Sequence, residues 1–177
     1  MSQSVHNRIE TVPHRVNRMS IAVGEPFDVF RARYESAVPR FEAERFERLV
    51  EDEADWDTIR QATAENAPHT FIIYWTGDFN ALLRLAGDRL RCVEYLMGNH
   101  TIAQRMFHHN PAIQLYAPLR TAIHEDAEGE TWFSVEQPSS HFSSFGSPDI
   151  TEVGLELDRE LAALLEYLGV PVPAALT

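Results

Sequence analysis

Four polar residues at strand spacing carry the strongest chemical signal in this 177-residue sequence. Arg120 and His124 alternate along one predicted strand, Glu136 lies on the next strand, and Glu94 lies on a third. Because successive side chains of a strand point to opposite faces of a sheet, all four are expected on one face. A carboxylate, an imidazole and a guanidinium together could bind an anionic ligand or perform acid–base chemistry.

This convergence requires the face to be covered, either by a partner subunit or by the predicted helices of residues 25–66. A covered Glu94 carboxylate costs several kcal/mol unless a cation meets it, and Arg120 is the nearest cation by strand phase. The plainer alternative is a solvated sheet face on which Arg120 and Glu136 form a cross-strand pair. The sequence leaves both interpretations open for Glu94, Arg120, His124 and Glu136.

The eight histidines do not indicate a metal site. His100 and His108 fall on one predicted helix about 12 Å apart along its axis, since each residue rises about 1.5 Å. His108 and His109 point to different faces, and no HExxH, CxxC or His-x-His spacing occurs. The sequence therefore predicts solvated or hydrogen-bonded histidines and no metal, and it identifies no cofactor.

Nucleophile signatures are also absent from the sequence. Cys92 is the single cysteine, so an internal disulfide is excluded, and its strand phase predicts a small buried side chain. The serine pairs 139–140 and 143–144 lack the Gly-x-Ser-x-Gly pattern of hydrolases and are predicted to line a loop. No glycine-rich phosphate loop occurs, and Gly98-Asn99 is predicted to form a turn.

The charge balance argues against nucleic-acid and membrane partners. The net charge is −12, from 27 acidic and 15 basic side chains. Phosphate backbones and anionic lipid heads are bound by clustered basic residues, whereas the arginines here are scattered. Neither a signal-peptide pattern nor an apolar run of about 18 residues is found, so a cytoplasmic location is expected.

Hydrophobic periodicity predicts the elements that position these residues. Residues 1–15 are expected to be a loose lead-in. Period-two alternation and β-branched runs predict strands over residues 17–23, 70–76, 90–97, 119–125 and 131–137, the last two as a hairpin. Helical periodicity and capping residues predict helices after Pro26, around 41–50, after Asp55, and over 80–86, 101–109 and 148–168.

The last helix has the clearest boundaries. Ser147 suits the N-cap, Pro148 the first helical position and Gly169 the position after the end, around a stripe of leucines. The element order predicts a single α+β domain over residues 1–177, with helices packed on one face of a mostly antiparallel sheet. Residues 25–66 would be an N-terminal helical insertion.

Three motifs occur in a recognisable order: EYLMGNH at 94–100, YAPLR at 116–120 and FSVEQP at 133–138. From about Thr70 onward the chain therefore resembles the domain-of-unknown-function family 302 (DUF302). That family usually has a proline where His100 stands, and its compact form lacks so long a segment as 25–66. The resemblance implies a small α+β fold and a homodimer, without an established reaction.

Three functions are compatible with these observations. The first is a homodimeric domain that binds a small molecule in a polar pocket on or beside the sheet. The second is an enzyme acting on a small metabolite, with Glu94 or His124 as general base and Arg120 holding an anion. The third is a structural or interaction subunit that uses the aromatic helices of residues 26–62 as its contact surface.

Overall fold

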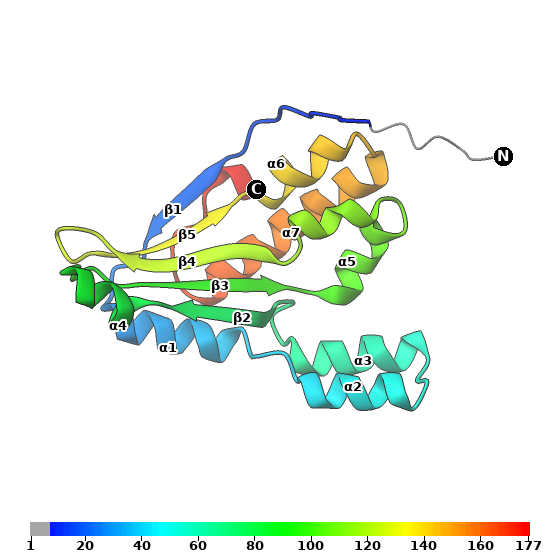
Figure 1. Cartoon of the computed structure of the whole chain (residues 1–177), viewed down its shortest axis with the longest axis horizontal. Helices are drawn as coiled ribbons and strands as arrows, with labels where there is room; N and C mark the ends of the chain where they lie inside the picture. The colour runs from blue at the N-terminus through cyan, green and yellow to red at the C-terminus, as the bar shows by residue number, and fades with distance from the viewer. Residues whose placement is uncertain (1–7) are drawn as a thin grey trace.

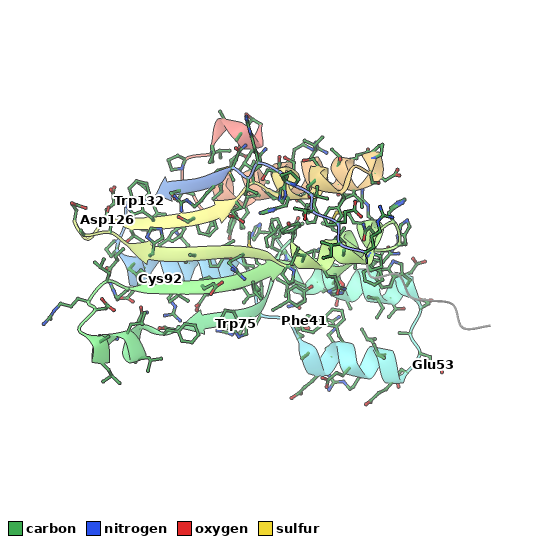
Figure 2. All side chains as sticks on the ribbon, turned by 45° about the horizontal axis from the view of Figure 1, so that its top comes forward. Phe41, Glu53, Trp75, Cys92, Asp126 and Trp132 are labelled. Atoms are coloured by element: carbon green, nitrogen blue, oxygen red, sulfur yellow. The ribbon has the colours of Figure 1, made fainter. Side chains whose placement is uncertain are left out.

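The computed structural model describes residues 8–177 and confirms the α+β class (Figure 1). Within these residues the strands form one antiparallel sheet in the order β1-β5-β4-β3-β2. Their bounds are β1 (Arg18–Ala22), β2 (Ile72–Asp78), β3 (Cys92–Gly98), β4 (Leu119–Glu125) and β5 (Thr131–Glu136). The predicted hairpin is confirmed as β4–β5, and the indole Nε1 of Trp132 donates to Asp126 Oδ2 at 2.8 Å across its turn (Figure 2).

Seven α-helices accompany the sheet in the described part of the chain. They are α1 (Phe27–Ala37), α2 (Ala43–Glu51), α3 (Trp56–Asn66), α4 (Asn80–Leu83), α5 (His100–Phe107), α6 (Pro138–Phe142) and α7 (Pro148–Tyr167). Asp55 caps α3 by accepting a hydrogen bond from Thr58 N at 2.8 Å, as its position predicts.

The serine-rich stretch predicted as a loop instead begins with α6. Pro138 occupies the first turn of this helix, where its missing N–H costs nothing. The buried Asp158 of α7 then accepts hydrogen bonds from Ser139 N at 2.9 Å and from Ser139 Oγ at 2.6 Å. This cap comes from a residue far along the chain, so local sequence patterns could not reveal it.

The core lies against one face of the sheet, here called the inner face. The ring of Tyr34 on α1 packs 5.0 Å from that of Tyr95 on β3 and 5.5 Å from that of Phe133 on β5. The apolar stripe of α7 joins the same cluster, and Figure 1 shows this helix behind the sheet. Its buried members include Ile150, Val153, Leu157, Leu161, Leu164, Leu165 and Leu168.

The three helices of residues 25–66 have two different places in the fold. Helix α1 contributes Phe27, Phe30 and Tyr34 to the core on the inner face. Helices α2 and α3 lie side by side beyond the start of β2, at the same end of the molecule as α5 (Figure 1). The opposite, polar face of the sheet is therefore covered by none of them.

The α7 stripe yields a direct test of this packing. Leu161 is fully buried, so Leu161→Ala should lower the free energy of unfolding by about 2–5 kcal/mol, measured by urea denaturation. Leu155 on the same helix is 47% exposed, and Leu155→Ala should change it by less than about 0.5 kcal/mol. Equal effects of the two substitutions would contradict the orientation of α7.

Candidate functional site

The polar face of the sheet carries Glu94, Arg120, His124 and Glu136, the four residues that the strand pattern places together. Arg120 on β4 lies directly opposite Leu96 on β3. Glu94, two residues before Leu96, is therefore the diagonal neighbour of Arg120. The Nε atom of Arg120 lies 2.9 Å from Glu94 Oε1, which makes an ion pair. The side chains of Arg120 and Glu94 are 75% and 32% exposed, so the pair sits on a solvated surface.

The other two residues of the set have partners elsewhere. His124 Nε2 lies 3.0 Å from Ser134 Oγ on the neighbouring strand. Glu136 Oε2 lies 2.7 Å from His141 Nε2, because α6 follows β5 directly and turns His141 back toward it. The four residues thus form three separate local interactions. The solvated alternative expected an ion pair between Arg120 and Glu136, whereas the structure pairs Arg120 with Glu94.

A polar cavity of about 370 Å³ opens beside the sheet where β4 begins. Two of the four predicted residues, Arg120 and Glu136, line it, whereas Glu94 and His124 do not. The remaining lining residues are Leu96, Gln114, Leu115, Tyr116, Pro118, Leu119 and His141. The cavity therefore combines a cation and a carboxylate with apolar walls, the composition expected of a small-molecule site.

Sequence reasoning missed two side chains of the polar cavity. The rings of Tyr116 and His141 stack with their centroids 4.3 Å apart, and His14 packs edge-on against both. Tyr116 belongs to the YAPLR motif, so a signal for it was present. His141 carried none, because its contact with Glu136 depends on the unpredicted helix α6.

An apolar cavity of about 410 Å³ lies on the other side of segment 114–119. It shares Gln114, Pro118 and Leu119 with the polar cavity. Leu119 points to the inner face and Arg120 to the polar face, so this segment forms the wall between the two cavities. The other lining residues are Tyr74, Gly98, Asn99, His100, Ile102, Ala103, Met106, Ala117, Phe142 and Leu157.

His100 links three elements at the edge of the apolar cavity. Its Nε2 lies 2.7 Å from Thr63 Oγ1 on α3, and Nδ1 lies 2.7 Å from Tyr74 OH on β2. Because Thr63 Oγ1 donates its own proton to Ile59 O, it must accept from His100 Nε2–H. His100 Nδ1 then accepts from the Tyr74 hydroxyl, so the network is satisfied by a neutral imidazole.

The surroundings of His100 also favour its neutral form. The rings of Phe41 and Phe46 meet the imidazole edge-on, with centroids 5.8 and 4.9 Å away. Desolvation lowers the pKa of His100 below its ordinary value, and burial raises the pKa of Tyr74 to about 12. His100 is therefore a hydrogen-bonded structural histidine that ties α2 and α3 to the sheet.

The prediction that Cys92 is buried is wrong, since the residue is exposed at the start of β3 (Figure 2). The buried phase of this strand consists of Val93, Tyr95 and Met97, and Cys92 belongs to the opposite phase. Partial desolvation is the main cause that raises the pKa of the Cys92 thiol, and the nearby carboxylates of Glu94 and Asp78 raise it further. A raised pKa reduces the thiolate fraction, which does not favour a nucleophilic role.

Two features are absent from residues 8–177. No group of three or more His, Cys, Asp or Glu side chains in this range is arranged to hold a metal ion. No helix in it is long and apolar enough to cross a membrane.

Comparison with known proteins adds the family. A family model described as "Domain of unknown function DUF302" matches residues 52–168, more than half of the chain. The chain belongs to the DUF302 family. A crystal structure of an uncharacterized conserved DUF302 protein from Bacillus stearothermophilus matches with a TM-score of 0.57 and 14% identity, covering 85% of this chain and 95% of that one. No curated protein matches the chain.

The DUF302 match also bears on the two cavities. The sequence motifs at 94–100 and 116–120 lie within the matched range and supply much of both cavity walls. Strand β1 and helix α1 precede the range that the DUF302 model matches, yet both belong to the common core. At 14% identity the structural match shows a shared fold and nothing further about chemistry.

The His100 network predicts a pH dependence of stability. Because the pKa of His100 is lowered in the folded protein, the unfolded chain binds the proton first as the pH falls. The free energy of unfolding should therefore decrease below about pH 6.5, the ordinary histidine pKa, and level off below the folded pKa. His100→Gln should flatten this part of the profile, measured by urea denaturation between pH 4.5 and about 8. Parallel profiles for both proteins would contradict the assignment.

Proposed function

We propose that this DUF302 protein binds a small molecule in the polar cavity beside its sheet. The proposal rests on the position and exposure of the Arg120 side chain. This residue lines the cavity and is held in place through Nε by Glu94, yet 75% of its side chain is exposed. Its terminal amino groups are therefore accessible, and a planar guanidinium binds a carboxylate or phosphate with two parallel hydrogen bonds.

The rest of the cavity suits the same role. Leu96, Leu115 and Pro118 supply apolar walls, while Glu136 offers a carboxylate held by His141. The volume of about 370 Å³ falls within the usual range of about 300–1,000 Å³ for ligand sites. The chain carries a net charge of −12, so long-range electrostatic attraction does not favour an anionic ligand. Binding of an anion therefore depends on the local charge of Arg120.

Binding is favoured over acid–base catalysis by the state of the candidate bases. A general base needs an accessible atom within about 2.6–3.2 Å of the proton that it removes. His141 Nε2 is engaged by Glu136 and its Nδ1 is buried, while His124 Nε2 is engaged by Ser134. Glu94 is committed to Arg120. The geometry thus gives the binding function more support than the enzymatic one.

The role of Arg120 can be tested with a panel of small carboxylates and phosphate esters in a thermal-shift assay. Compounds that raise the melting temperature of the wild type should fail to do so for Arg120→Gln. They should still act on Arg159→Gln, which alters an exposed arginine on α7 outside the cavity. Without ligand, Arg120→Gln should cost less than about 1 kcal/mol, because exposed ion pairs contribute about 0–1 kcal/mol.

Either of two results would contradict this site. One is a panel in which no carboxylate or phosphate ester stabilises the wild type. The other is a hit that stabilises Arg120→Gln as much as Arg159→Gln.

We also propose that the protein is a homodimer, through a different surface from the one that the sequence suggested. The aromatic side chains of residues 26–50 are mostly internal, since Phe27, Phe30, Tyr34 and Phe46 are buried. Exposed large apolar residues instead gather within residues 75–90, which span the end of β2, α4 and the turn before β3. They are Trp75, Phe79, Leu82, Leu83, Leu85 and Leu90. Exposed apolar groups in this number are typical of interaction surfaces.

Sedimentation velocity at micromolar concentration tests the dimer. The wild type should sediment with twice the mass of one chain, and Leu85→Glu should shift it toward the monomer, because Leu85 is 84% exposed in the single chain. Val50→Glu, which alters a residue on α2 that is 74% exposed, should leave the dimer intact. A wild-type monomer would refute the dimer, and a dimeric Leu85→Glu would refute this interface.

A further inference from the structure

The apolar cavity is a chemically distinct space from the polar one. Its walls are the helices α5, α6 and α7 and the segment before β4, with Met106 and Phe142 fully buried and Leu157 nearly so. Among the described residues that line it there is no Asp, Glu, Lys or Arg. A charged ligand would lose its hydration there without meeting an opposite charge.

The polar groups at the edge of this cavity are already committed to the protein. Asn99 Oδ1 accepts from the backbone N–H groups of Thr101 and Ile102, and Asn99 Nδ2 donates to Thr70 O at 2.7 Å. Tyr74 OH and both ring nitrogens of His100 are engaged in the network described above. Little hydrogen-bonding capacity remains for a ligand, apart from Gln114, which is exposed at the shared wall.

The cavity is preformed by specific close contacts. Helix α6 approaches α7 at Gly154, where an added Cβ would lie 3.0 Å from Phe142 Cβ and 3.1 Å from Ser139 Cα. This approach, together with the Asp158 cap of α6, sets the position of Phe142 in the wall. On the opposite side, Gly98 allows Pro118 to come close, since a Cβ there would lie 3.3 Å from Pro118 Cα.

We propose that the apolar cavity is a second binding site, which takes a neutral, predominantly apolar small molecule. Its volume of about 410 Å³ exceeds the cavity of about 150 Å³ that accommodates benzene in an engineered protein core. Met106 adds an unbranched, polarisable side chain that adapts to ligands of different outline. The two cavities share Gln114, Pro118 and Leu119, but Arg120 and Glu136 line only the polar one and Met106 only the apolar one.

Methyl NMR with 1-octanol and octanoate as matched probes tests the ligand class. The two molecules share one chain length and differ in charge. The Met106 methyl signal should shift with octanol concentration until the site is saturated. The affinity for octanoate should be at least tenfold weaker, because none of the described residues 8–177 that line the cavity is a cation. The methyl of Met19, which lies outside the cavity, should not move.

Variants of α5 then place the probe in the cavity. Ala103→Trp fills the space and should weaken octanol binding at least tenfold, whereas Gln104→Trp, which alters the adjacent exposed residue, should not. Arg120→Gln should bind octanol normally, so failure of the polar site leaves this result unaffected.

The proposal is overturned if the Met106 shift does not saturate in the wild type, or if octanoate binds as tightly as octanol. It is also overturned if Met19 and Met106 shift together, because Met19 lies in the core outside the cavity and a common shift would indicate a change of the whole core. These readouts come from the unmodified protein and remain decisive even if Ala103→Trp does not fold.

Discussion

Tyr34 joins α1 to the middle of the sheet. Its ring lies among those of Phe133 and Tyr95, and its hydroxyl lies 3.2 Å from Thr121 Oγ1 and donates to Met97 Sδ at 3.1 Å. Burial raises the pKa of Tyr34, so the hydroxyl stays protonated and can donate. Because this contact places α1 on the inner face, α1 and α7 fill that side, and the polar face keeps its charged residues in water.

Segment 114–119 contributes lining residues to both cavities. It leads into β4, so Leu119 enters the core while Arg120 enters the solvated face. Alternation along one strand therefore separates an apolar space under α5 from a polar space beside β5. The close contact between Gly98 and Pro118 helps to set the position of this wall. A single short segment thus influences both proposed sites.

Two features that the sequence analysis marked as unusual, His100 and the segment 25–66, meet in space. Helix α3 of this segment lies within the range that the DUF302 model matches, whereas α1 and α2 precede it. In the structure, His100 is the residue that contacts Phe46 of α2 and Thr63 of α3. A proline at this position could offer neither ring nitrogen, so the histidine makes an attachment to α2 and α3 that a proline could not make.

Local patterns in the sequence were sufficient to predict the strands, the α-helices other than α6, and the residues that share a face. The α7 stripe, the β4–β5 hairpin, the Asp55 cap and the common phase of Glu94 and Arg120 all follow from periodicities of two or 3.6 residues and from capping chemistry. These signals depend on neighbours along the chain, so they are visible without a fold.

Only the tertiary structure decided which face of each strand is covered and which partner each polar group meets. Cys92 was expected inside because it shares its phase with Leu96, yet α1 and α7 pack on the phase of Val93 and Tyr95. Glu136 contacts His141 because α6 exists, and α6 depends on Asp158, nearly twenty residues further along the chain. Periodicity groups side chains into faces, but helix packing determines which of those faces meets water.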